Sequence, residues 1–234
     1  MKKLLFTIIS LLILVSCKNK PETNLKITGN IKGLQKGTLY LKKMGDSTFV
    51  TIDSMKIDGK SEFESNINLK SPEMLYLFLD RGETNSGDNN LMFFAEPGKI
   101  NIATDLEYFY SKAVVTGSKN NELYENYKKI TSKYNEQQLE LTVAKINALK
   151  NKQMDLIASI EEKSNAVTKR KYLYAINFAV TNKEYEVAPY IALSEINDAT
   201  IIYLDTIQKS MSPKVAKSRY GVMLTKYVGE RKKQ

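Results

Sequence analysis

The chain has 234 residues and a formal net charge of +9, with one cysteine and neither histidine nor tryptophan. Without histidine, the common Ser-His-Asp and Cys-His nucleophile sites and histidine-bound zinc, iron or copper centres are excluded. The sequence also lacks the two common glycine-rich phosphate-binding motifs, G-x-x-x-x-G-K-[ST] and G-x-G-x-x-G. We therefore predict no cofactor and no metal site, and we assign no catalytic residue.

The N-terminal segment has the pattern of a bacterial lipoprotein signal peptide. Two lysines precede the apolar run Leu4–Val15, the small residue Ser16 follows it, and Cys17 comes next. This run of 12 residues is shorter than the ~20 residues that span a bilayer and matches the apolar region of a signal peptide. We predict a signal peptide over residues 1–16, cleaved between Ser16 and Cys17. An uncleaved membrane anchor with an incidental cysteine is the alternative.

Lipidation of Cys17 would attach the protein to a membrane through its N-terminus. Buried acyl chains contribute ~0.8 kcal/mol per methylene group, and two or three chains give stable anchoring. Residues 17–23 would form a lipidated tether, and no free thiol would remain for thiol–disulfide exchange. Lys18 stands where some lipoproteins carry an aspartate that retains them in the inner membrane, and no acidic run follows. We therefore expect attachment to the outer membrane, facing the periplasm.

The excess positive charge lies in the second half of the chain. Residues 18–117 carry 13 basic and 13 acidic residues, whereas residues 118–234 carry 20 and 13. Most of the basic residues are lysines scattered among Glu and Asn, which is typical of a solvated helical face. We predict no nucleic-acid partner, and weak association with an anionic membrane or polymer is the alternative.

Residues 24–118 are predicted to form a β-domain. Apolar and polar residues alternate in this half, and turn signals such as Asp58-Gly59-Lys60 and Glu96-Pro97-Gly98 separate the candidate strands. Seven or eight short strands at this spacing favour an antiparallel β-sandwich or barrel. The expected strands are Leu25–Ile31, Thr38–Leu41, Phe49–Ile57, Ser61–Leu69, Met74–Leu79, Leu91–Ala95, Ile100–Thr104 and Ala113–Val115.

The polar segment from Asp80 to Asn90 is predicted to be an exposed hairpin tip. Together with Glu83 and Asp88, these two residues offer the oxygen ligands that calcium prefers, but their spacing is not that of an EF-hand. We therefore do not predict a calcium site there.

Residues 119–230 are predicted to be helical, with a basic tail over 231–234. From Ser118 to Ala188 the chain has neither glycine nor proline, and it is rich in helix formers. A single helix over Lys119–Lys163 would be ~67 Å long, so we expect a break near Asn135 or Asn147–Asn151 that folds it into a hairpin. Further helices are expected at Val167–Thr181, Val187–Asn197, Asp198–Met211 and Lys214–Val228, with Asp198 as an N-cap and Ser212-Pro213 as a helix start.

Two groups of apolar residues recur at helical spacing in this half. Seven tyrosines occupy positions that predict core and rim packing in preference to ligand stacking: Tyr172, Tyr174, Tyr185, Tyr190, Tyr203, Tyr220 and Tyr227. An apolar stripe also runs through the predicted hairpin: Leu139, Val143, Ile146, Leu149, Met154, Ile157 and Ile160.

Several short segments of the strand half follow one another in a distinctive order and spacing. They are Ile27-Thr28-Gly29-Asn30-Ile31-Lys32-Gly33-Leu34, Gly37-Thr38-Leu39-Tyr40-Leu41, Ile52-Asp53-Ser54, Asp58-Gly59-Lys60-Ser61-Glu62-Phe63, Pro72, Phe94-Ala95-Glu96-Pro97-Gly98 and Val115-Thr116-Gly117-Ser118. Together they resemble an uncharacterised N-terminal domain of Bacteroidetes-type lipoproteins, which a thioredoxin-like domain commonly follows. The stretch ending in Ser218-Arg219-Tyr220-Gly221 is similar to the helices before that redox domain. Because the sequence has no Cys-x-x-Cys, the family's thiol–disulfide chemistry is not expected here.

These observations favour an α+β protein of the cell envelope that works by binding. We expect a non-enzymatic binding or interaction module, held to the membrane by its N-terminal lipid, whose partner is an unidentified envelope protein or ligand. One alternative is an accessory role for a separate thioredoxin-like redox protein. The other is a carboxylate-dependent envelope hydrolase, for which two carboxyl groups ~5–10 Å apart would have to flank a cleft.

Overall fold

The computed structural model describes residues 23–82 and 89–233. The predicted signal peptide, Ser16, Cys17 and nearly all of the tether therefore lie outside the described residues. So do Glu83 and Asp88 of the predicted hairpin tip. Within the described part of the chain, no helix combines the length and apolar character needed to cross a membrane.

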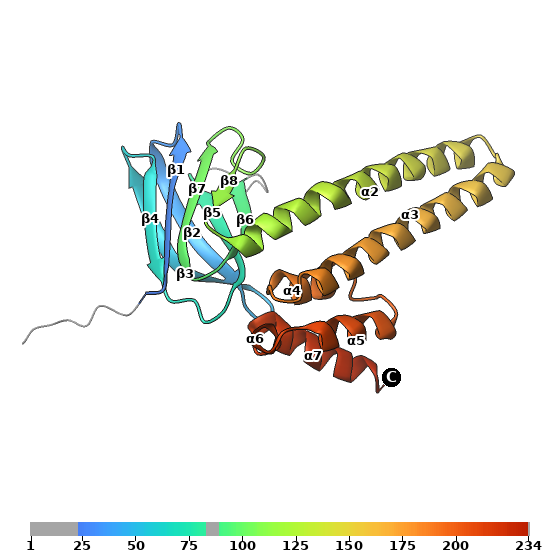
Figure 1. Cartoon of the computed structure of the whole chain (residues 1–234). Coiled ribbons are helices and arrows are strands. Elements are labelled where there is room, and N and C mark those ends of the chain that lie inside the picture. The colour runs from blue at the N-terminus through green and yellow to red at the C-terminus, as the bar shows by residue number, and fades with distance from the viewer. Residues whose placement is uncertain (1–22, 83–88, 234) are drawn as a thin grey trace, which may run out of the picture.

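The first half folds into two packed four-stranded sheets, as the alternating sequence predicted (Figure 1). One sheet has the strand order β4-β1-β7-β8 and the other the order β3-β2-β5-β6. All eight predicted strands are present within the described residues, with ends shifted by a few residues. They are β1 (Leu25–Lys32), β2 (Lys36–Met44), β3 (Phe49–Asp58), β4 (Glu62–Ile67), β5 (Glu73–Asp80), β6 (Asn90–Ala95), β7 (Gly98–Asp105) and β8 (Val114–Thr116).

The prediction of an antiparallel sandwich is wrong for one strand pair. Strands β1 and β7 run parallel, with Leu25 opposite Gly98 and Lys32 opposite Asp105. The reason is the turn at Glu96-Pro97-Gly98, which carries the chain from β6 in one sheet to β7 in the other. It delivers β7 at the end of the sandwich where β1 also begins. The other pairs are antiparallel.

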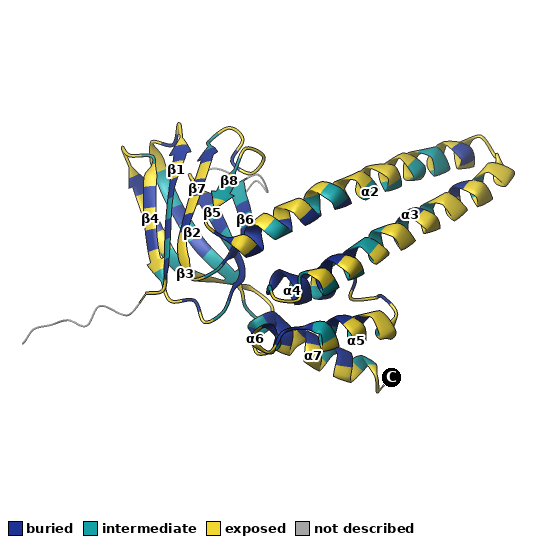
Figure 2. Ribbon diagram, viewed as in Figure 1, coloured by how far each residue is buried: buried dark blue, intermediate teal, exposed yellow. Residues whose placement is uncertain are grey.

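Inward-facing apolar side chains of both sheets fill the sandwich. In β5, Leu75, Leu77 and Leu79 are buried in this core, whereas the alternate residues face the other side of the sheet. Met74 of β5 and Phe94 of β6 belong to a second core, which they share with the helices. Thus the outer face of the sheet that contains β5 and β6 carries the helical half of the molecule (Figure 2).

Six helices follow the sandwich within the described residues. They are α2 (Lys119–Lys150), α3 (Met154–Thr181), α4 (Val187–Glu195), α5 (Ile201–Ser210), α6 (Pro213–Ala216) and α7 (Arg219–Arg231). Gly117 allows the chain to enter α2, because a Cβ atom there would lie 2.0 Å from the carbonyl oxygen of Lys99. Helices α2 and α3 form a long hairpin that projects away from the sandwich, and α4 to α7 pack beside its base (Figure 1).

The hairpin turns at the second of the two predicted break points. The backbone N–H of Gln153 donates to the carbonyl of Ala148, and that of Lys152 donates to Leu149. This is the Schellman pattern of helix ends, and Lys152 adopts the left-handed conformation (φ 57°) that glycine usually supplies. The chain therefore reverses without glycine or proline, which explains why the sequence marked the break only weakly.

Three predicted helix boundaries are wrong. Helix α3 does not begin at Val167 but runs unbroken from Met154, since nothing between them interrupts it. Asp198 is not an N-cap. Thr200 occupies that position, and the Asp198 carboxylate instead accepts a hydrogen bond from the hydroxyl of Tyr172 at 2.7 Å. The single helix predicted over Lys214–Val228 is two helices, because Ser218 caps α7. The predicted start at Ser212-Pro213 is confirmed.

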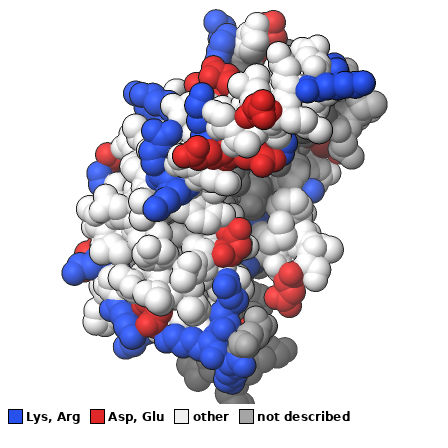
Figure 3. Space-filling view, turned by 90° about the vertical axis from the view of Figure 1, so that its right-hand side faces the viewer, with Lys and Arg blue, Asp and Glu red and all other residues white. Residues whose placement is uncertain are grey.

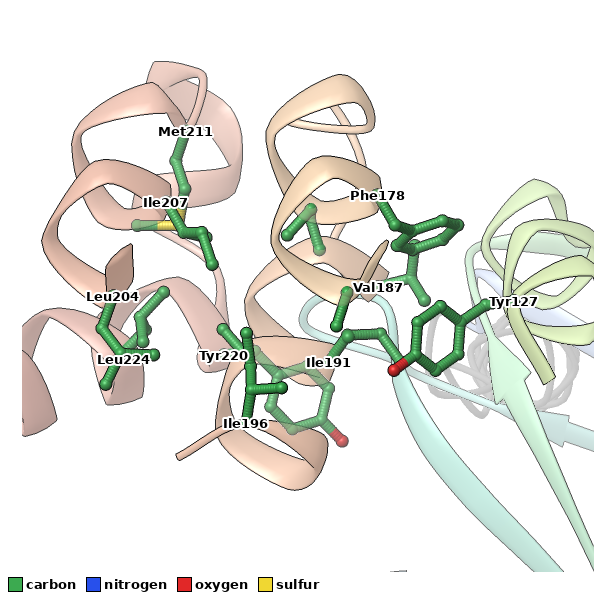
Figure 4. Close-up of a cluster of buried hydrophobic side chains, with 14 of the residues drawn as sticks. Tyr127, Phe178, Val187, Ile191, Ile196, Leu204, Ile207, Met211, Tyr220 and Leu224 are labelled. Atoms are coloured by element: carbon green, nitrogen blue, oxygen red, sulfur yellow. The ribbon is translucent and has the colours of Figure 1, made fainter. Parts of the chain in front are cut away.

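The helical core is dense where the helices meet the sheet. Tyr127 of α2 and Phe178 of α3 lie against each other with ring centroids 5.0 Å apart, and Leu204 and Leu224 fill the space between α5 and α7 (Figure 4). Six of the seven tyrosines singled out above contribute to this core or its rim, whereas Tyr203 is exposed. Their predicted role in packing is thus confirmed for all but Tyr203.

Candidate functional site

A cleft of about 490 Å³ lies where the sandwich meets the helices. Five separate parts of the chain form it: the connection before β5, the turn after β6, the start of α2, the segment just before α4, and the segment from α6 to the N-cap of α7. We call it the junction cleft. The residues that line it are Lys70, Ser71, Pro72, Glu96, Pro97, Lys119, Asn120, Tyr185, Glu186, Lys214, Lys217 and Ser218.

The amide of Asn120 joins the two acidic residues of the junction cleft. Its Nδ2 donates to Glu96 Oε2 at 2.7 Å and to Glu186 Oε2 at 3.1 Å. Its Oδ1 accepts from the backbone N–H of Val187 at 2.9 Å, at the start of α4. Asn120 is 2% exposed and Glu186 is 1% exposed. A buried amide with these hydrogen bonds fixes α2, α4 and the sheet relative to one another.

Glu96 binds the N-terminus of α2. Its carboxylate accepts from the backbone N–H groups of Lys119 at 2.7 Å and Asn120 at 3.2 Å. Such N–H groups have no partner within the helix, and the helix dipole favours negative charge at this end. Ser118 completes the cap by accepting from the N–H of Asn121. The carboxylate of Glu96 therefore serves to hold α2 on the sandwich.

Four lysines line the junction cleft together with Glu96 and Glu186. Lys214 Nζ lies 3.5 Å from Glu186 Oε1, and its side chain is 76% exposed. Lys119 pairs with Glu122 at 2.8 Å, and the hydrogen bond to that carboxylate raises the pKa of Lys119. Lys70 and Lys217 form no ion pair with any residue that the structure describes. The lining residues thus carry more positive than negative charge, and two of the ammonium groups are available to a ligand.

A second set of contacts next to the junction cleft ties α7 to the sheet. The guanidinium of Arg219 pairs with the buried carboxylate of Glu73 and donates to the carbonyl of Met44 at 2.6 Å. The hydroxyl of Tyr220 accepts from the backbone N–H of Met74 at 3.0 Å, and burial raises the pKa of Tyr220. These contacts hold the start of α7 against the sheet beside the cleft.

The sequence did not predict this site. Its two assigned site residues, Ser16 and Cys17, lie outside the described residues. Glu96 was expected only as part of a turn, and Asn120 and Glu186 were not singled out, because they are 66 residues apart in sequence. No cluster of three or more metal-ligating side chains occurs in the part of the chain that the structure describes.

The comparisons with known proteins concern mainly the strand half and leave the function open. Residues 25–124 match the family model described as a domain of unknown function (DUF4369), which confirms the resemblance of the strand half to an uncharacterised domain. No curated protein matches the chain. Among solved structures, the transthyretin from Sparus aurata is similar at 18% identity and a TM-score of 0.29. The match covers 41% of this chain and 100% of that one.

Proposed function

We propose that this protein is a lipid-anchored, non-enzymatic lipoprotein of the cell envelope that binds a small anionic ligand in the junction cleft. The observation that carries the ligand site is the position of Lys70 and Lys217, two lysines without an ion pair among the described residues, at a cleft of about 490 Å³. Ligand sites are concave, with a few charged or polar groups that fix orientation. Carboxylate and phosphate groups are the anions that such lysines bind.

Titration calorimetry of the purified mature chain tests the ligand site, with inorganic phosphate and succinate as probes. We expect at least one probe to bind and the Lys70→Ala/Lys217→Ala variant to bind ~10-fold or more weakly, since two charge-assisted contacts are lost. The matched control is Lys129→Ala, which removes an exposed lysine of α2 outside the cleft. Equal affinity of the cleft variant and this control would refute the site.

The proposed anchor rests on the Leu4–Val15 run and the single cysteine that follows it. Palmitate labelling of cells that produce the protein should mark the wild-type chain and not the Cys17→Ala variant. The variant should also leave the membrane fraction, because stable attachment needs the acyl chains. Protease treatment of intact cells then separates a periplasmic from a surface location, and we propose the periplasmic face of the outer membrane.

One observation favours a hydrolase as the second candidate. Glu96 and Glu186 line the same cleft, and paired carboxyl groups at a cleft are what glycoside hydrolysis requires. Both carboxylates already hold the fold together through Asn120, which argues for a structural role. Release of soluble sugar from envelope glycan by the wild-type protein, lost in Glu186→Gln, would establish the hydrolase and displace the binding proposal.

A further inference from the structure

The outer part of the α2–α3 hairpin exposes an apolar stripe to solvent. We define the arm as residues 132–166 and the arm stripe as Leu139, Val143 and Ile146. These three side chains are 65%, 51% and 47% exposed. Scattered apolar residues are normal on a protein surface, whereas a row at helical spacing is typical of an interface.

The arm stripe faces away from α3. Leu141, which lines grooves together with residues of α3, marks the inner side of α2. Leu139 and Val143 are each two residues from Leu141, which places them about 200° around the helix from it. The contacts between the two helices, such as Gln138 Nε2 to Ser164 Oγ at 2.8 Å, use the inner side. Pairing within the hairpin therefore leaves the arm stripe uncovered.

The charges along the same face are arranged with opposite signs at its two ends. Glu136 lies at one end of the arm stripe and Lys150 at the other, and each is seven residues from Val143. Neither forms an ion pair with any described residue. Figure 3 shows that basic and acidic side chains are interspersed on the side of the molecule toward which the arm points. An anionic lipid surface would meet Glu136 and Glu140 beside the stripe, so these charges do not favour it.

We propose that the arm stripe binds the arm stripe of a second copy of this chain in antiparallel orientation. A twofold axis at Val143 brings Glu136 of each copy to Lys150 of the other, so that two ion pairs form, and sets the apolar side chains between them. Parallel pairing would instead oppose like charges at both ends. The charge pattern thus fits a second copy and specifies its direction.

The contact is small, so the dimer is weak and its assembly depends on protein concentration. Interfaces below about 1,200 Å² are typical of transient complexes. Both copies would present their junction clefts outside this contact, since the cleft lies at the opposite end of α2. Self-association and ligand binding are therefore separate properties that can be tested independently.

Sedimentation velocity of the mature chain over a range of concentrations tests the proposal. Val143→Asp should abolish the dimer, because it places two carboxylates at the axis. Glu136→Lys and Lys150→Glu should each raise the dissociation constant about 10-fold, since two attractive pairs become repulsive. The double variant Glu136→Lys/Lys150→Glu should recover wild-type affinity within about threefold, because the attraction is restored with its signs exchanged.

The matched control is Ile202→Asp, which places the same charge at an apolar side chain of α5 that is 69% exposed. This variant should dimerise as the wild type does, and circular dichroism should show that all variants retain their helix content. A wild-type chain that stays monomeric at all concentrations would overturn the proposal. So would a dimer that Val143→Asp leaves intact, or single charge variants that the double variant fails to rescue.

Discussion

The two ends of helix α2 lie in different surroundings, although one continuous helix contains both. In its first turns, Asn120, Tyr124 and Tyr127 are buried against the sheet and the other helices. In the arm, only Ala148 and Ile160 are buried (Figure 2). Packing therefore determines the structure of the first part, and helix propensity with hairpin pairing determines the second. The three residues of the arm stripe are left exposed by this packing, which is why we propose that they bind a second copy.

The largest expected contrast concerns apolar side chains in the two regions. Phe94 is fully buried between the sheet and the helices, with its ring 5.6 Å from that of Tyr190 and 5.9 Å from that of Tyr220. Phe94→Ala should lower the free energy of unfolding by about 3–5 kcal/mol, as other large-to-small core changes do. Leu149→Ala in the arm should change it by about 0.5 kcal/mol or less. Urea denaturation measures both changes. Similar decreases in the free energy of unfolding for Phe94→Ala and Leu149→Ala would contradict the contrast between a packed base and an exposed arm.

A comparable contrast is expected for two asparagines of α2. Asn120→Ala removes the amide between Glu96 and Glu186, so the free energy of unfolding should fall by about 2–3 kcal/mol, because buried partners lose their hydrogen bonds. Asn147 is exposed in the arm, and Asn147→Ala should have almost no effect. An Asn120→Ala variant with the wild-type free energy of unfolding would show that the hydrogen bonds of Asn120 to Glu96 and Glu186 do not join the sandwich to the helices.

Alkaline pH should destabilise the packed region. Burial raises the pKa of Tyr190 to about 12, above its value of ~10 in an unfolded chain. Because the pKa is higher in the folded chain, the protonated Tyr190 side chain contributes its full stability below pH ~10. This contribution to the free energy of unfolding is lost as the pH rises toward about 12. In Tyr190→Phe, the free energy of unfolding should therefore fall less steeply between pH ~10 and about 12. Denaturation at each pH measures this slope. An unchanged slope would show that Tyr190 is not the titrating group.

The smallest expected effect is at the turn of the arm. Lys152 holds a left-handed backbone conformation, which favours glycine over other residues by roughly 1 kcal/mol. Lys152→Gly should therefore raise thermal stability slightly. Lys133→Gly, the same change at an exposed position in the interior of α2, should lower stability by about 1 kcal/mol. If both substitutions were destabilising, the backbone conformation at Lys152 would not be strained.

Local patterns in the sequence predicted the secondary structure well and the long-range contacts poorly. Alternating apolar and polar residues, with turn residues between them, were enough to predict all eight strands. The absence of glycine and proline was enough to predict that the second half is helical. The parallel pairing of β1 with β7 was missed because the residue pattern within a strand does not indicate which strand lies next to it or in which direction that strand runs. Asn120, Glu96 and Glu186 come together only through tertiary folding, so no spacing could have linked them. The stripe from Leu139 to Ile160 correctly predicted helical structure on both sides of the hairpin turn. The sequence did not reveal that five of its seven residues are exposed: Leu139, Val143, Ile146, Leu149 and Met154.

Hydrogen exchange along α2 tests most directly the claim that a packed base carries an exposed arm. In dilute protein, where copies do not meet, amides of residues 136–150 should exchange much faster than those of residues 122–131, since few buried contacts oppose local opening of the arm. Uniform protection along the whole helix would contradict this division of the molecule.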